Sequence, residues 1–396
     1  MKGSETYLLP FLEGAQKYFI IPVYQRKYDW KIDNCRQLYE DLKRMLRENR
    51  PSHFFGSIVS AVEGNGGKIE YHVIDGQQRL TTVTLLLLAM RNLVAKGVLT
   101  SSRQNLSQEI EQRFLISPWA PEEDRIRLKP VKGDREAFRK LFGAEEDFVP
   151  TSNLTHNYEF FRDILLRQEI SVDELFDAIG RLQVISITLE SGDNAQLIFE
   201  SLNSTGLALS EGDKIRNYIL MGQSPRMQDY LYETYWTKIE SCTSHEVSAF
   251  VRDYLSIKQQ VTPTINTVYR AFKGYAAETG QDGESFLKDM LDYARLYERL
   301  LTCKSGLNNQ KLDDCLYRMK RLEIAVTRPF LMEVLRLNQD GKLTTDEVLR
   351  VFLMTENYLF RRNICEVPTN ALNKIFLNLN REILRYDGTA NQYLDK

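Results

Sequence analysis

The sequence predicts an N-terminal α+β domain followed by a large, mainly α-helical domain. Two segments, 54–62 and 69–74, alternate apolar and polar residues with the period of two that is typical of half-buried strands. The next segment, from Gly76 to about Lys96, carries leucine, valine and methionine at helical spacing and predicts a deeply buried helix. From Pro225 to the end, tyrosine and leucine recur at helical spacing, which indicates packed helices.

Residues 1–150 are predicted to form the α/β domain. The glycine-rich segment between the two strands predicts a hairpin turn. Besides these strands and the buried helix, we expect a strand at 18–21, helices at 33–49 and near 134–142, and short paired strands at 114–116 and 125–128.

Residues 151–224 are predicted to form a second block that completes this module, and residues 225–396 an all-helical domain. Ser171, with Glu174 three residues later, predicts a capped helix start. The second block is expected to contain helices at 153–168, 171–180 and 194–202 and a strand at 182–189. The expected helices of the last domain lie near 226–240, 245–258, 264–278, 284–302, 309–320, 324–338, 345–362 and 369–384.

The composition is that of a globular protein, with 43% hydrophobic and 27% charged residues. A net charge of −2 argues against a protein-wide basic surface for nucleic acid, although a local basic groove remains compatible with it. The five cysteines are scattered without Cys-x-x-Cys spacing, so neither a disulfide framework nor a zinc site is expected. No signal peptide is apparent, and no apolar run approaches the roughly 20 residues of a membrane span. We therefore expect a cytoplasmic protein without membrane association.

The junction between the second strand and the buried helix carries the densest motif, Asp75-Gly76-Gln77-Gln78-Arg79. Asp75 is expected to cap the helix and Gln78 to complete a capping box. Gly76 allows a sharp turn and the close approach of a ligand. A helix N-terminus can hold a phosphate, and the planar fork of Arg79 could clamp the same anion. The alternative is a self-satisfied helix cap with Arg79 on the surface.

A second stretch, 21–30, interleaves aromatic and polar residues. Tyr24, Tyr28 and Trp30 could stack a base while basic neighbours meet phosphate, or they could anchor a loop to the core. We expect a mixture, in which Gln25 and Arg26 point towards a ligand and Trp30 mostly packs.

A third stretch places a polar loop between two helices, around 203–214. Ser210 is expected to cap the second helix. Asn203, Asp213 and Lys214 are either ordinary capping residues or ligands of a nucleotide and its cation, because amide and carboxylate oxygens suit Mg²⁺.

Four stretches, at 21–30, 54–59, 73–82 and 198–214, together resemble the N-terminal family of GmrSD-type restriction endonucleases. That family is similar to the ParB and sulfiredoxin nucleotide-binding fold, in which a Gly-x-x-Arg turn at a helix start holds phosphates. Gly76 and Arg79 match that turn. The resemblance therefore implies a ParB/sulfiredoxin-like α+β domain at the N-terminus.

The resemblance also implies roles for individual residues. Asp75 and Arg79 would act in catalysis, and Asp213 would bind a Mg²⁺ ion that accompanies a nucleoside triphosphate. The implied nucleotide-binding residues are Gln25, Arg26, Gly76, Gln77, Gln78, Arg79, Asn203 and Lys214.

The function implied is that of a nucleotide-binding and nucleotide-hydrolysing sensor in a bacterial modification-dependent restriction system directed against phage. GTP, CTP and ATP remain equal candidates. The alternatives are a DNA-binding or modified-base-reading module without nucleotide turnover, and a scaffold in which the motif only stabilises a turn.

Expected partners are DNA, a nuclease of the His-Asn-His type and, for a homo-oligomer, further copies of the chain. The four histidines, at 53, 72, 156 and 245, are widely separated, so no such nuclease centre is expected among these residues. We expect either a piece of a longer protein or a stand-alone sensor module.

Overall fold

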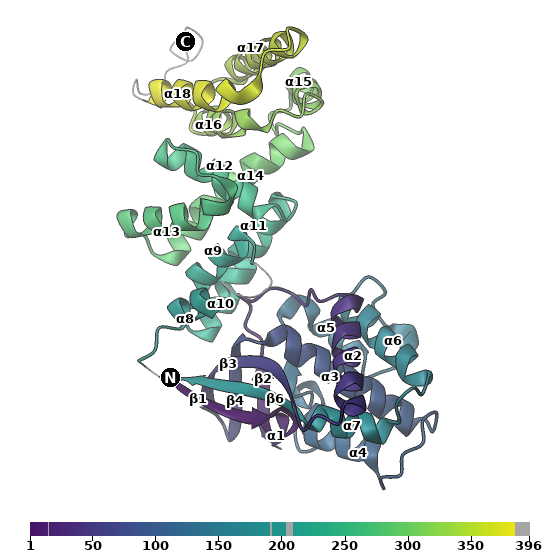
Figure 1. The fold of residues 1–396 in the computed structure, drawn as a ribbon. Helices are drawn as coiled ribbons and strands as arrows, with labels where there is room; N and C mark the ends of the chain where they lie inside the picture. The colour runs from purple at the N-terminus through teal and green to yellow at the C-terminus, as the bar shows by residue number, and fades with distance from the viewer. Residues whose placement is uncertain (15, 191, 203–208, 385–396) are drawn as a thin grey trace. The chain divides into compact units, whose positions relative to one another are not determined.

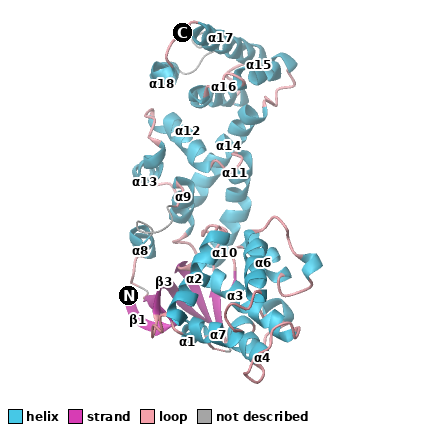
Figure 2. Ribbon diagram, turned by 45° about the vertical axis from the view of Figure 1, so that its right-hand side comes forward, coloured by secondary structure: helices cyan, strands magenta, loops and turns pink. Residues whose placement is uncertain are grey.

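The computed structural model describes residues 1–14, 16–190, 192–202 and 209–384 (Figure 1). The chain divides into two compact units, residues 1–207 and 208–396. The first unit combines a sheet with helices, and the described part of the second is helical (Figure 2). The predicted fold class, an N-terminal α+β part followed by a mainly helical part, is confirmed. The predicted division at residues 150 and 224 stays a prediction.

The first unit contains a mixed six-stranded sheet among its described residues, in the order β1-β6-β3-β4-β2-β5. Its strands are β1 (Lys2–Tyr7), β2 (Lys17–Ile20), β3 (His53–Asn65), β4 (Lys68–Asp75), β5 (Leu128–Lys129) and β6 (Leu182–Leu189). β3 and β4 form the predicted antiparallel hairpin. β2 runs parallel to β4 and β5, and β3 runs parallel to β6. The carboxyl ends of β2 and β4 therefore lie at the same edge.

Helix α3 (Gln77–Ala95) follows β4 and is buried on nearly every face, as its leucine-rich sequence predicts. It contacts α4 and α6 and joins one hydrophobic core with the sheet. The helices of this unit are α1 (Leu8–Leu12), α2 (Ile32–Arg47), α4 (Leu106–Ile110), α5 (Lys132–Lys140), α6 (Asn153–Leu166), α7 (Val172–Gly180) and α8 (Ala195–Leu202). The capping box of Ser171 and Glu174 is present at the start of α7, as predicted.

The region between 110 and 130 differs from the expectation of two short paired strands. A π-helical turn, Glu111–Leu115, occupies most of the first segment, and Ile116 forms a single antiparallel bridge with Ile126. The second segment overlaps β5, which pairs with β2 instead. Burial explains the difference, because Phe114 and Leu115 both enter the core, which a turn of helix permits and a strand with alternating faces does not.

The second unit packs its helices around tyrosine, phenylalanine, leucine and one tryptophan. Tyr293, Leu296, Tyr297 and Leu300 are buried on α14, which confirms their reading as core residues. Its helices are α9 (Glu211–Leu220), α10 (Pro225–Leu231), α11 (Thr237–Cys242), α12 (Val247–Gln259), α13 (Val268–Thr279), α14 (Gly283–Thr302), α15 (Gln310–Lys320), α16 (Arg328–Gln339), α17 (Thr345–Ile364) and α18 (Leu372–Leu384). A π-helical turn, Tyr232–Trp236, joins α10 to α11.

Candidate functional site

The turn between β4 and α3 depends on Gly76. Its φ angle is 91°, in the left-handed region that glycine tolerates best. A Cβ atom at this position would lie 2.9 Å from the carbonyl oxygen of Ser57 and 3.1 Å from the side chain of Ile58. The backbone of β3 therefore passes so close to the turn that only glycine fits, which agrees with the predicted sharp turn.

The predicted capping box at this helix start is wrong. Gly76, not Asp75, occupies the N-cap position, and no side chain caps it. Asp75 is the last residue of β4, and its Oδ2 lies 3.1 Å from Nη2 of Arg79, one helical turn later. The left-handed conformation of Gly76 explains the change, because it shifts the helix start by one residue and turns Asp75 out of capping position.

Arg79 is held at the start of α3 by the protein itself. Its Nη2 donates to the carbonyl oxygen of Ser57 at 2.8 Å as well as to Asp75. The guanidinium lies over Gly56, where a Cβ atom would be 3.0 Å from Nε. The register of β3 shifts against β6 beside Gly56, which is the kind of bulge that often re-aims a side chain next to a functional site.

One side of the Arg79 guanidinium stays available. Nε is buried without a hydrogen-bond partner, and Nη1 makes no hydrogen bond or ion pair with the described residues. The side chain is 25% exposed, so an anion could reach it from solvent. A guanidinium fixed on one edge and open on the other suits the clamping of an anion.

Gln78 holds the stretch 21–30 against the helix start. Its Oε1 accepts from the backbone N–H groups of Asp29 at 2.9 Å and Trp30 at 3.2 Å. Its Nε2 donates to the carbonyl oxygen of Lys27 at 3.2 Å. The residue is buried, and both of its polar atoms are engaged within the chain. Its predicted contact with a nucleotide stays a prediction, but its observed contacts are those of a positioning residue.

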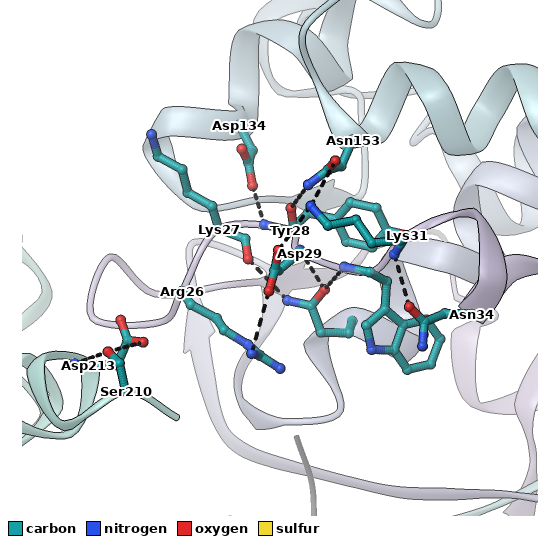
Figure 3. Close-up of polar contacts among 12 residues, drawn as sticks. Arg26, Lys27, Tyr28, Asp29, Lys31, Asn34, Asp134, Asn153, Ser210 and Asp213 are labelled. Atoms are coloured by element: carbon teal, nitrogen blue, oxygen red, sulfur yellow. Dashed lines mark hydrogen bonds and ion pairs between the residues drawn. The ribbon is translucent and has the colours of Figure 1, made fainter. Parts of the chain in front are cut away.

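Gln25 serves the same loop from the other side. It is buried, and its Nε2 donates to the carbonyl oxygen of Ile74 at 2.8 Å, one residue before Asp75. Gln77 is also buried, and no hydrogen bond of its side chain occurs among the described residues. Arg26 is partly exposed, and its Nη1 lies 3.9 Å from Oδ2 of Asp29 (Figure 3). The structure thus brings Gln25, Arg26 and the motif residues 75–79 into the same unit.

The aromatic residues of this loop anchor it to the core. Tyr24 and Tyr28 are buried, so neither ring is open for stacking on a base. The Tyr28 hydroxyl lies 2.7 Å from the Thr82 hydroxyl on α3 and accepts from Nδ2 of Asn157 on α6 at 2.9 Å. Burial raises the pKa of Tyr28 well above its usual value, so the phenol stays neutral. The anchoring interpretation therefore holds for both tyrosines.

Two residues that sequence reasoning missed complete this loop. Asp134, on α5, accepts the backbone N–H of Tyr28 at 2.6 Å (Figure 3). Burial raises the pKa of Asp134, and the hydrogen bond from Tyr28 partly opposes that effect. Asn157 also donates to the carbonyl oxygen of Trp30 at 2.8 Å. No sequence signal marks either residue, because both act on a loop more than 100 positions away.

The described part of the stretch 203–214 begins at Leu209 and belongs to the other unit. Ser210 caps α9, as predicted, by accepting from the backbone N–H of Asp213 at 3.0 Å (Figure 3). Oδ1 of Asp213 accepts from Arg216 at 2.7 Å, and Nζ of Lys214 lies 2.7 Å from Glu211. Asn203 lies outside the described residues. Asp213 and Lys214 therefore both have partners of opposite charge on α9.

The comparison with known families covers the part of the chain that contains these polar stretches. The family model of the GmrSD restriction endonuclease N-terminal domain matches residues 8–220, which is more than half of the chain. The chain belongs to the GmrSD N-terminal family. The match with the GmrSD model ends at Leu220, the last residue of α9, and therefore includes the stretches 73–82 and 198–214. A search of curated proteins found no match.

The acidic residues implied for this GmrSD-family chain each form an ion pair with an arginine. Within the described residues, no group of three or more His, Cys, Asp or Glu side chains could hold an ion. Asp75 is paired with Arg79, and Asp213 with Arg216. The expected Mg²⁺, which would accompany a bound nucleotide and take phosphate oxygens as further ligands, stays a prediction.

The described part of the chain also contains no helix that is both long enough and apolar enough to span a membrane.

Proposed function

We propose that this chain is a nucleotide-binding regulatory module of a modification-dependent restriction system. The single observation that carries the proposal is Arg79. It is fixed on one edge by Ser57 and Asp75, it is open on the other, and it stands at the start of a buried helix whose first amide groups lack side-chain caps. Helix N-termini and arginine side chains both recur as phosphate-binding features of proteins.

The two glycines of the turn let the chain's own atoms pack closely around Arg79. A Cβ atom at Gly76 would meet Ser57 and Ile58, and one at Gly56 would meet the Arg79 side chain, so both glycines help to fix the guanidinium in the position proposed for binding phosphate. Gln77 carries a buried carboxamide beside Gly76, which adds a neutral donor and acceptor. In this proposal Gly76, Gln77 and Arg79 contact the phosphates, Arg26 assists from the loop, and Gln25 and Gln78 position that loop.

Hydrolysis is the second part of the proposal. Oδ2 of Asp75 lies 3.1 Å from Nη2 of Arg79, so this carboxylate would orient an attacking water and accept its proton. Phosphoryl transfer needs the developing charge to be stabilised, and Arg79 is the group that this unit offers for it. The nucleotide state would then license a nuclease that acts on DNA, and the site of that action would be the bacterial cytoplasm.

Calorimetric titration with GTP, CTP and ATP, with and without Mg²⁺, tests the proposal. We expect micromolar binding of one nucleotide to the native chain. Loss of a charge-assisted phosphate contact in Arg79→Ala should weaken that binding by about 2–3 kcal/mol, or about 30- to 150-fold. Arg47→Ala removes an exposed arginine from α2 in the same unit and should bind normally.

Failure of every nucleotide to bind the folded chain would refute the nucleotide switch. It would leave the DNA-reading alternative, which predicts salt-dependent DNA binding in the absence of nucleotide. Turnover is tested separately by phosphate release in Asp75→Asn, which should bind nucleotide but hydrolyse it more slowly.

A further inference from the structure

A cleft of about 460 Å³ lies in the first unit, at the end of β4 that is opposite to the motif 75–79. Residues of β2, β4, β5 and α5 line it, among them Tyr18, Lys68 and Lys129. Lys68 is the first residue of β4 and Asp75 the last, so about 23 Å of strand separates them at about 3.3 Å per residue. The cleft shares no lining residue with the motif 75–79.

Two lysines of this cleft meet at one carboxylate and one tyrosine ring. Lys68 and Lys129 share one carboxylate, Asp124, whose oxygens lie 2.8 Å and 3.4 Å from the two ammonium groups. Both ammonium groups also lie over the ring of Tyr18, at 5.3 Å and 6.0 Å from its centroid. Burial lowers the pKa of Lys129 although Asp124 opposes the shift, so this cation is incompletely compensated.

Helix α5 adds two arginines to the wall of the cleft. Arg135 and Arg139 are one helical turn apart, and both line the cleft. Nε of Arg135 donates to the carbonyl oxygen of Pro130 at 3.1 Å. Arg139 is exposed, and no hydrogen bond or ion pair of its side chain occurs among the described residues. Four cationic side chains therefore line the cleft, against three carboxylates, in a protein whose net charge is −2.

We propose that this cleft binds a phosphate group. Lys68 and Lys129 are both half-buried and share the carboxylate of Asp124, so a further anion in the cleft would gain from the positive charge that Asp124 leaves uncompensated. Two arginine forks and two lysines offer more donors than one carboxylate ligand would use, whereas a phosphate presents several acceptor oxygens. The volume is large enough for a nucleotide-sized ligand. The phosphate comes from a DNA backbone or from a free nucleotide, and both sources offer the same chemistry.

The test removes one charge at a time from the full chain. Arg139→Gln is the main variant, because an exposed side chain can be changed without disturbing the fold. Lys129→Gln probes the half-buried cation, and Arg47→Gln is the matched control from the exposed face of α2. Circular dichroism and thermal melting confirm that each variant is folded. Binding is measured with a fluorescent DNA duplex by anisotropy, and with GTP, CTP and ATP by calorimetry.

A backbone phosphodiester predicts that Arg139→Gln weakens duplex binding by about three- to tenfold and lowers the slope of log K against log salt by about 0.9. A free nucleotide predicts a similar loss in the calorimetric arm with duplex binding unchanged. Equal affinities for native chain, Arg139→Gln and Lys129→Gln in both arms would overturn the inference, as would binding of neither probe to the native chain. Arg79→Ala is titrated in parallel, so the nucleotide site can fail while this cleft stands, and the reverse.

Discussion

Gln78→Met is the sharpest test of how the functional loop is held. Methionine keeps the length and most of the volume of glutamine but removes its polar atoms. The native side chain makes three hydrogen bonds to backbone groups of Lys27, Asp29 and Trp30, at 2.9–3.2 Å. At a net value of about 0.5–1.5 kcal/mol each, their loss should cost about 2–4 kcal/mol of unfolding free energy.

Two measurements locate this loss. Urea denaturation gives the free energy of unfolding, and hydrogen exchange followed by mass spectrometry reports on the peptide that spans 26–31. We expect the amides of Asp29 and Trp30 to lose protection, because their acceptor is the missing Oε1. Gln37→Met on the exposed face of α2 is the control and should change stability by no more than about 0.5 kcal/mol.

The same variant separates positioning from direct binding. A positioning residue predicts a destabilised loop, with a fall in nucleotide affinity that follows from it. If Gln78→Met leaves stability and the exchange of 26–31 unchanged, the three hydrogen bonds do not matter and our reasoning about this loop is wrong. If affinity alone falls, Gln78 contacts the ligand directly.

Three further predictions concern charge and backbone. Gly76→Ala should lower the free energy of unfolding by about 2–4 kcal/mol in urea denaturation, because the left-handed conformation costs alanine about 1–2 kcal/mol and its Cβ atom would collide with the carbonyl oxygen of Ser57. Gly64→Ala is the control, because a Cβ atom there meets no atom within 4 Å, and equal losses in the two variants would contradict this prediction. Asp75→Asn should tighten nucleotide binding without Mg²⁺ by about three- to tenfold in calorimetry. The substitution removes the negative charge of the Asp75 carboxylate, which would otherwise repel the negatively charged phosphates, and weaker binding would contradict this reasoning. Burial raises the pKa of Asp253 to about 6, so the native state binds this proton more tightly than the unfolded chain and the free energy of unfolding falls by about 2 kcal/mol as pH rises from 4 to 6; Asp253→Asn should remove that slope in pH-dependent melting, and a retained slope would assign it to another group.

Local patterns predicted the elements well where one residue type decides the backbone. The hairpin of β3 and β4 and the buried α3 follow from periodicity, and Ser171 and Ser210 cap their helices as expected. The cap at α3 failed because two local signals competed. Asp is a residue type that often caps helices, but Gly76 adopts the left-handed conformation and occupies the N-cap position of α3.

The partners of the glutamines could not be predicted from local sequence. Gln78 bonds to residues about 50 positions earlier, and Gln25 to Ile74, so their roles exist only once β4 and the loop are side by side. Asp134 and Asn157 are more distant still and come from helices with no motif. The sequence therefore identified the stretch that forms the candidate site. It could not show which of its residues position the loop and which are available to bind a ligand.

That division is what the structure contributes to the argument about function. The polar side-chain atoms of Gln25, Gln78 and Tyr28 form hydrogen bonds with groups of the same unit, and these bonds fix the loop against the start of α3. Arg79 differs, because Ser57 and Asp75 both accept from one nitrogen, Nη2, whereas the buried Nε and the nitrogen Nη1 make no hydrogen bond with the described residues. A motif that only stabilised a turn would have no reason to keep a cation partly exposed above Gly56. The arrangement of the fixed residues around one unfilled donor favours an anion as the missing partner.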